Sequence, residues 1–300
     1  MTDEASRVDD LSARRHRGSA LVALHTAVAL FGFAALFGQW IALPATAIVL
    51  GRTTTAAATL AIVARLRGQR MGSGDWRLAV SGAILALHWV SFFAAVKIAG
   101  VAIALLGYAV FPVFVLLLER PQRSGGIREW TTALLATAGL MALVPELSWT
   151  NQATRGLAWA LVSAFTFASL TVRNRALVAT RSAIGIALWQ NLFAAACLLP
   201  WVLAFGGPDA VPGPIDIGLL LVLGTLCTGL SHTLFIASMR RVSAHTASVV
   251  AALEPVYGIV LAALLLGERP ASRTIVGGVL IVAAALNASL RTEVGEVRSV

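Results

Sequence analysis

Long apolar runs alternate with short polar breaks along almost the whole chain. Each run is close to the ~20 residues that an α-helix needs to cross a hydrocarbon core about 30 Å thick. None has the alternation of a membrane β-strand, and open sheet edges are not tolerated in lipid. The pattern therefore predicts an all-α integral membrane protein with ten transmembrane helices. They are expected at residues 19–40, 44–66, 76–97, 99–118, 129–146, 155–175, 182–205, 214–239, 243–266 and 272–290.

The second half of the chain resembles the first half. A shift of 143 positions places Pro255 on Pro112 and Phe235 on Phe92. The same shift aligns Val256 with Val113, Tyr257 with Phe114, Ala237 with Ala94 and Arg240 with Lys97. Because each unit holds an odd number of spans, the second unit should be inverted relative to the first, as in many transporters. The predicted architecture is two inverted five-helix repeats.

This repeat divides the chain into five parts. Residues 19–146 form the first repeat and residues 155–290 the second, separated by an outward loop at 147–154. Polar tails occupy residues 1–18 and 291–300, and we expect the first tail to lack regular structure. The apolar run after it is too long for the core of a cleavable signal peptide and is expected to remain as the first span.

Lysine and arginine residues collect on one side of the predicted spans. Most of the 23 fall on the side of the two termini. The opposite side has Lys97, Arg155, Arg269 and Arg273. Since cytoplasmic loops are enriched in Lys and Arg, we expect both termini in the cytoplasm and the spans in a bacterial inner (plasma) membrane.

Composition excludes several classes of function. With 58% hydrophobic residues, 12% charged residues and a mean hydropathy of +0.83, little of the chain can lie outside the membrane. The net charge of +9 comes from helix ends rather than one soluble face, so we expect no nucleic-acid partner. The sequence lacks nucleophile elbows, phosphate loops and paired metal ligands. We therefore expect no catalytic residue, no metal and no cofactor.

Glu254 is the most informative single residue. It lies about eleven residues, or roughly 16 Å, into its span and so near the bilayer midplane. An acid there costs on the order of 2 to 4 kcal/mol unless it is paired or hydrated. It either serves proton coupling or a substrate amine, or it caps backbone groups freed by Pro255. Both interpretations of Glu254 stay open. The 143-residue shift places Phe111 of the first half at the position of Glu254.

Arg52 is the one lysine or arginine that lies in the interior of a predicted span rather than near its end. It would either bind a substrate carboxylate or act as counter-ion to Glu254. We favour the counter-ion role, because a buried guanidinium without a partner is very costly. Pro112 and Pro255 occupy matching positions in the two halves and are the expected hinges.

Histidines and aromatic residues complete the predicted pathway. His88 and His232 fall near the midplane, one in each half, although the 143-residue shift misses aligning them by one position. Each would act in a pH-responsive gate or pack by hydrogen bonding between helices, and we favour packing. An apolar cavity with few polar anchors suits organic solutes. The predicted lining is Phe31, His88, Phe92, Tyr108, Phe165, Thr166, Ser169, His232, Phe235 and Tyr257.

Two segments, residues 88–119 and 253–286, resemble the EamA family of the drug/metabolite transporter superfamily. In the second segment Pro255, the turn 267–269 and the pair 277–278 fall where the family's repeat has them. In the first half Arg52, Pro112 and Glu119 match family positions. The first repeat departs from the pattern by a shorter fourth helix and by the sequence Glu119-Arg120-Pro121-Gln122 in place of a glycine-glutamate turn.

The resemblance covers residues 20–290 and implies ten helices, inverted repeats and export of small organic metabolites from a central cavity. We therefore expect a monomeric carrier for amino acids or related amphipathic compounds, either facilitative or driven by an ion such as the proton. The alternatives are an intramembrane lipid-modifying enzyme, a channel and a non-transporting membrane subunit. An enzyme would require a cluster of acids or a metal triad, and a channel would require a continuous polar stripe.

Overall fold

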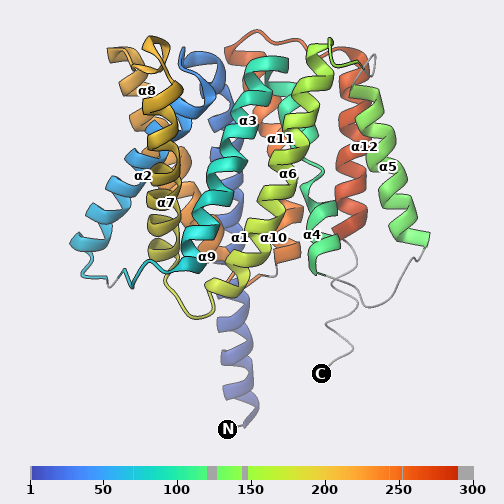
Figure 1. Cartoon of the computed structure of the whole chain (residues 1–300). Coiled ribbons are helices and arrows are strands. Elements are labelled where there is room, and N and C mark those ends of the chain that lie inside the picture. Colours follow the sequence, from blue (N-terminus) through green and yellow to red (C-terminus); the bar gives the residue numbers. More distant parts are fainter. Residues whose placement is uncertain are drawn as a thin grey trace.

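The computed structural model shows a bundle of helices that run back and forth through one slab (Figure 1). It describes residues 2–69, 71–119, 127–143, 148–242, 244–251 and 253–289, and these ranges contain no strand. The elements in chain order are α1 (Thr2–Trp40), α2 (Ala45–Leu66), α3 (Trp76–Tyr108), α4 (Phe111–Glu119), α5 (Ile127–Leu143), α6 (Gln152–Leu177), α7 (Ala183–Phe205), η1 (Pro208–Ala210), α8 (Pro214–Gly224), η2 (Thr225–Leu230), α9 (Ser231–Ser238), α10 (Ala244–Ala251), α11 (Glu254–Leu265) and α12 (Ser272–Ser289).

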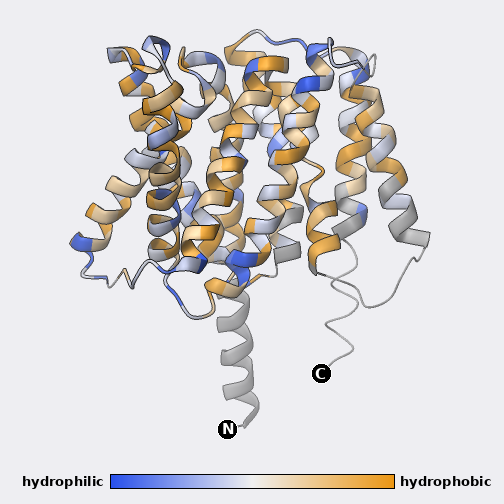
Figure 2. Ribbon diagram, viewed as in Figure 1, coloured by the Kyte–Doolittle hydropathy of each residue, from blue (hydrophilic) through white to orange (hydrophobic). Residues whose placement is uncertain are grey.

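Within these described ranges the elements make ten crossings of the slab, as the apolar pattern predicts. The segment α8–η2–α9 forms one crossing and α10–α11 forms another. Six helical segments are long and apolar enough to cross a bilayer: α1 from Gly18, α2, α3, α6, α7 and α8 to α9. Figure 2 shows apolar residues along the length of the bundle and hydrophilic residues gathered at its two ends. The chain is an all-helical, multi-pass membrane protein.

Three segments differ from the sequence expectation. The N-terminal tail, expected without regular structure, is helical and forms the first part of α1, which begins at Thr2. Its Ala, Arg, Glu and Leu residues are good helix formers. The predicted helix at 99–118 is broken between α3 and α4, just before Pro112. The predicted helix at 243–266 is broken between α10 and α11, just before Pro255. The turn 120–122, the repeat boundary at 146 and the tail 291–300 lie outside the described residues.

Gly100 forms the junction of the third and fourth crossings. Its φ of 81° and ψ of 171° interrupt α3, and such a backbone conformation is practically restricted to glycine. The N–H of Val101, which begins the next crossing, donates a hydrogen bond of 3.2 Å to Oε1 of Glu268. A loop of the second half therefore caps a helix of the first half.

Capping side chains fix where other helices begin. Asp75 accepts a hydrogen bond from the N–H of Leu78 at the start of α3. Asn151 accepts from Ala153 at the start of α6, and Ser182 accepts from Gly185 at the start of α7. Each satisfies one of the backbone donors that a helix leaves open at its N-terminus.

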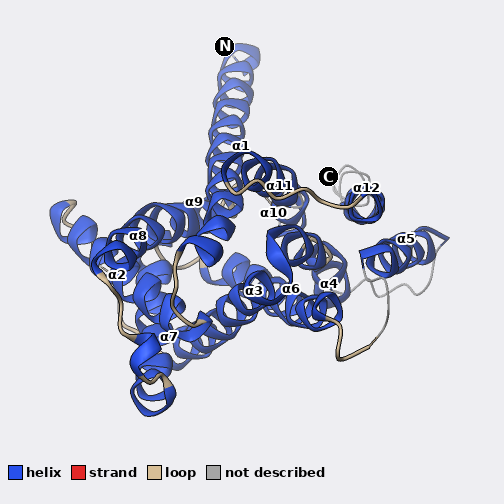
Figure 3. Ribbon diagram, turned by 90° about the horizontal axis from the view of Figure 1, so that it is seen from above, coloured by secondary structure: helices blue, strands red, loops and turns tan. Residues whose placement is uncertain are grey.

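Helix contacts pair equivalent crossings of the two halves. The second crossing (α2) packs against the seventh (α7), and the fifth (α5) packs against the tenth (α12). Likewise α3 packs on α6 while α9 packs on α1, and α4 packs on α6 while α11 packs on α1. Figure 3 shows α5 beside α12 at one end of the bundle and α2, α7 and α8 at the other.

Two glycine pairs allow helix backbones to meet. A Cβ on Gly32 of α1 would lie 3.0 Å from the backbone N of Gly258 in α11. A Cβ on Gly139 of α5 would lie 2.9 Å from the carbonyl of Gly277 in α12, and the reverse distance is 2.8 Å. Without hydrophobic pressure between helices in lipid, such close approach supplies the packing energy that holds helix pairs together.

Candidate substrate cavity

A small cavity lies at the centre of the bundle. It has an empty volume of about 370 Å³, of which about 20 Å³ is open to the centres of water-sized molecules. This suffices for one or two waters, so a larger solute requires a different helix arrangement. Residues of α1, α2, α3, α6, α9 and α11 line it: Phe31, Ala34, Arg52, His88, Trp89, Phe92, Tyr108, Phe167, His232 and Glu254.

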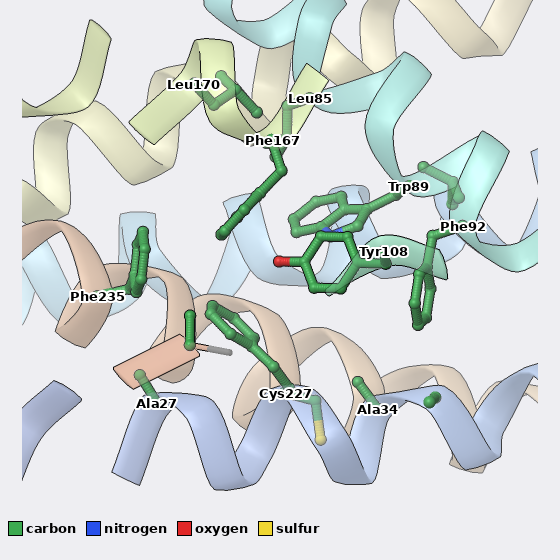
Figure 4. Packing of buried hydrophobic residues seen from close by; sticks show 14 of the residues in the cluster. Ala27, Ala34, Leu85, Trp89, Phe92, Tyr108, Phe167, Leu170, Cys227 and Phe235 are labelled. Carbon is green, nitrogen blue, oxygen red and sulfur yellow. The ribbon is translucent and has the colours of Figure 1, made fainter. Parts of the chain in front are cut away.

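Aromatic rings form most of the wall. Figure 4 shows Phe167, Trp89 and Tyr108 gathered between the helices, with Phe92 and Phe235 to either side. The ring of Phe167 contacts those of Tyr108 at 5.4 Å and Phe235 at 5.3 Å between centroids. These spacings are typical of favourable ring pairs, so the wall is a packed apolar surface.

Arg52 projects from α2 into this wall, and its side chain is only 2% exposed. Its guanidinium carbon lies 3.9 Å from the ring centroid of Trp89, which is a close cation–π contact. Nε donates to the hydroxyl of Thr228 at 2.9 Å, and Nη2 donates to the carbonyl of Cys227 at 3.4 Å. Neutral groups therefore hold the buried charge.

The π-helical turn η2 supplies both hydrogen-bond partners of Arg52, Thr228 and the carbonyl of Cys227. Backbone bonds in a π turn run to the fifth residue rather than the fourth, and such turns are frequent at functional sites. Thr228 also donates its hydroxyl hydrogen to the carbonyl of Leu223, five residues earlier, at 2.7 Å. Gly224 lets α8 approach α2 here, because a Cβ would lie 2.9 Å from the carbonyl of Arg52.

Glu254 is the first residue of α11 and is 4% exposed. The break before it places the carboxyl group at a helix N-terminus, where the helix dipole favours negative charge. Its side chain interacts with that of Tyr108 across the cavity. Among the described residues, however, no hydrogen-bond partner reaches the buried Oε2 atom.

Arg52 and Glu254 face the same cavity without forming an ion pair. No nitrogen–oxygen distance of 4.0 Å or less joins these two described side chains. The sequence interpretation of Arg52 as a direct counter-ion is therefore not seen in this conformation. Both side chains therefore line the cavity without serving as each other's direct partner.

The two histidines are held from different helices. Nδ1 of His88 lies 3.0 Å from the carbonyl oxygen and 2.9 Å from the hydroxyl of Ser163. Since a carbonyl can only accept, Nδ1 of His88 carries the proton. Nε2 of His232 lies 3.0 Å from Oε1 of Gln190. Both imidazoles are buried in the cavity wall.

The predicted lining residues separate into two groups. Phe31, His88, Phe92, Tyr108 and His232 line the cavity, as do Arg52 and Glu254. Phe235 is buried directly behind it, 5.7 Å from Phe31 between ring centroids.

Four predicted residues of the pathway lie elsewhere. Phe165 is 49% exposed and packs on Phe114 at the outer face, and Tyr257 is also exposed. The hydroxyls of Thr166 and Ser169 donate to carbonyls one turn earlier in α6. None of the four lines the cavity. The hinge candidates Pro112 and Pro255 lie in the first turns of α4 and α11, directly after the two breaks.

Sequence reasoning missed Ala34, Trp89 and Phe167 as lining residues and Thr228 as the ligand of Arg52. Phe165 and Phe167 differ by two positions on one helix and so point in widely different directions. The sequence signals that both are near the midplane but not which one faces inward. Nothing in the composition of residues 225–230 marks a π turn.

An ion pair stabilises the α2–α3 loop outside the spans. Nη2 of Arg181 lies 2.6 Å from Oδ2 of Asp75. The hydrogen bond from the N–H of Leu78 lowers the pKa of the Asp75 carboxyl, and Arg181 lowers it further. This loop therefore ties α3 to the start of α7.

A second hollow lies between α11 and α12 and has a different character. Its empty volume is about 960 Å³, and apolar side chains of both helices line it, with Pro255 at one edge. No charged side chain lines it.

Within the described residues there is also no group of three or more His, Cys, Asp or Glu side chains able to hold a metal.

Comparison with known proteins finds a family of transporters to which this chain is similar. Residues 154–290 match the model of the EamA-like transporter family. The second half of this chain is thus similar to the EamA-like transporter family. These likenesses are to transporters and not to enzymes.

Individual proteins are similar to this chain over more than residues 154–290. An uncharacterized transporter of Bacillus subtilis (strain 168), YxxF, is 23% identical over 286 residues, which cover 92% of this chain and 91% of the relative. An uncharacterized transporter of Archaeoglobus fulgidus is 27% identical over 196 residues, covering 65% of this chain and 70% of the relative. A protein of known crystal structure shares the fold with a TM-score of 0.68 at 21% identity, over 91% of this chain and 98% of the other.

Proposed function

We propose that the protein exports small organic metabolites, amino acids or related amphipathic compounds, by alternating access through the central cavity. The observation that carries this proposal is a small central cavity with one buried arginine, one buried acid and aromatic walls, lined by both halves of the chain. Such a surface suits a molecule with an apolar body and two oppositely charged ends.

Two inverted five-helix repeats are part of this proposal. Their support is the pairing of equivalent crossings, α2 with α7 and α5 with α12, together with the odd number of crossings in each half. The backbone breaks before Pro112 and Pro255 occur at positions related by the 143-residue shift. In the proposed cycle α4 and α11 rock at these two breaks and open the cavity to one side at a time.

Arg52 and Glu254 act as the electrostatic anchors of this cycle. Arg52 receives the carboxylate of the solute, and Glu254 receives its positive group or a proton. The distribution of Lys and Arg supports cytoplasmic termini in a bacterial inner membrane. Ten crossings enclose one cavity within one chain, which favours a functional monomer.

The test is counterflow of labelled amino acids in proteoliposomes that contain the purified protein. The matched variants are Phe167→Leu, in the cavity wall, and Phe165→Leu, on the outer face of the same helix. We expect flux of at least one amino acid, a drop of about tenfold or more in Phe167→Leu, and wild-type flux in Phe165→Leu. Absence of flux for all amino acids, or equal flux in the two variants, would contradict the proposed path.

A further inference from the structure

A chain of buried amides ends at His232. Nε2 of Gln190, in α7, donates to Oδ1 of Asn174, in α6, at 2.7 Å. On its other side Oε1 of Gln190 lies 3.0 Å from Nε2 of His232, in α9. All three side chains are buried. The amide chain thus links three helices behind the cavity.

The hydrogen bonds that join Asn174, Gln190 and His232 all run in one donor-to-acceptor direction. The side chain of Gln190 has one donor end and one acceptor end, and Asn174 takes the donor end. The acceptor end then faces His232, so Nε2 of His232 must carry the proton. His232 is thereby held in the Nε2–H tautomer, whereas Ser163 holds His88 in the opposite, Nδ1–H tautomer.

A fixed tautomer leaves a defined atom without a partner. Nδ1 of His232 is buried and has no hydrogen-bond partner among the described residues, and the same holds for Oε2 of Glu254. Both residues line the cavity. A buried acceptor left without a donor costs about 1 to 3 kcal/mol, so the pair favours an incoming group that brings several donors.

We propose that Gln190, held by Asn174, is a positioning residue that keeps Nδ1 of His232 as an acceptor. Nδ1 of His232 and Oε2 of Glu254 together receive the ammonium group of the transported molecule. The inference rests on the proposed function, because it assumes that the solute enters this cavity. It adds the atoms that bind the ammonium group of such a solute and the residues that position them.

The groups around the cavity agree with this assignment. An ammonium group brings three donors, whereas a hydroxyl brings one. Glu254 provides a carboxyl group, and the rings of Phe31 and Phe167 offer faces that attract a cation.

The first arm of the test reads the tautomer directly. Nitrogen-15 NMR of histidine-labelled protein separates protonated from unprotonated ring nitrogens, and the five histidines are assigned by single replacements. We expect a protonated Nε2 and an unprotonated Nδ1 for His232. The variants Gln190→Met and Asn174→Leu should each produce a mixture of tautomers. The control Asn191→Leu, which replaces the neighbouring amide, should leave the tautomer of His232 unchanged.

A wild-type His232 protonated at Nδ1, or a tautomer unaffected in both Gln190→Met and Asn174→Leu, would overturn the positioning role. Two variants are used because one of them can fail to fold. This result is independent of transport, so it stands apart from success or failure of the flux assay.

The second arm uses 2-phenylethylammonium as the probe and its N-acetyl derivative as the control. Accepting a hydrogen bond shifts the Nδ1 resonance of His232, and only the ammonium compound should cause this shift. The apparent affinity should fall about tenfold in Gln190→Met, the loss of one buried hydrogen bond to a charged group. A resonance unmoved at the highest soluble concentration of probe, or moved equally by both compounds, would overturn the ammonium assignment.

Discussion

The rings of Trp89 and His232 lie 5.8 Å apart, at an angle of 63°, on opposite halves of the chain. Their positions differ by 143, the separation that also relates Pro112 to Pro255. The ring of Trp89 makes a cation–π contact with the guanidinium of Arg52, and the ring of His232 is hydrogen-bonded to Gln190. Equivalent positions of the repeat thus meet at the centre and hold different polar groups, which makes the cavity chemically asymmetric.

Loss of the Thr228 hydroxyl should destabilise the protein. Thr228→Val removes the acceptor of the Nε hydrogen bond of Arg52. Bonds to charged groups contribute about 1.5 to 3 kcal/mol, so we expect a loss of unfolding free energy in that range. Thermal unfolding in detergent measures it. Thr225→Val is the matched control, since its exposed hydroxyl donates only within its own helix, and an equal loss there would refute the role of Thr228.

Glu254→Gln should remove the pH dependence of flux while the protein still folds. A carboxyl that binds either a proton or the solute makes transport change between pH 5.5 and pH 8, whereas an amide does not titrate. Counterflow at the two pH values measures the effect. Asp209→Asn, in the exposed η1 turn, should keep the wild-type profile. A pH profile unchanged in Glu254→Gln would remove this acid from coupling.

The sequence predicts the number of crossings because the bilayer imposes a length on every apolar run. It does not predict the two helix breaks, because the spans at 99–118 and 243–266 are expected as continuous helices. Pro112 and Pro255, which cannot donate a backbone hydrogen bond, indicate only where these helices are weakened. Nor does the sequence predict that Thr228 and the carbonyl of Cys227 bind Arg52. That contact depends on the rotation of α2 and on a π turn, and neither leaves a periodic signal in a uniformly apolar helix.

Gly100→Ala should destabilise the junction between the third and fourth crossings. The backbone there has φ 81° and ψ 171°, which costs about 1 to 3 kcal/mol for a residue with a Cβ. Thermal unfolding should show a loss of this size. Gly218→Ala is the control, because Gly218 is helical and has open space around its Cα. It should be neutral or stabilising by up to about 1 kcal/mol, and a comparable loss at both positions would argue against backbone strain.

Acid should weaken the α2–α3 loop through Asp75. The pKa of its carboxyl is lowered in the folded protein, so its contribution to stability is present above the ordinary value of 3.8 and disappears as pH falls through the lowered value. Asp75→Asn keeps a capping oxygen but loses the charge. We expect it to be less stable than the wild type at pH 7 and equal to it at the lowest accessible pH. A difference that persists in strong acid would contradict this account.

The π turn at Thr225–Leu230 has a consequence for how this helix has evolved. A π turn holds one residue more than an α turn over the same stretch of axis, so it behaves as a one-residue insertion absorbed inside a crossing. Deleting a single residue from this stretch would restore an uninterrupted α-helix and rotate Cys227 and Thr228 relative to Arg52. Arg52 would then lose a partner, so the length of this segment is constrained by a charge on another helix.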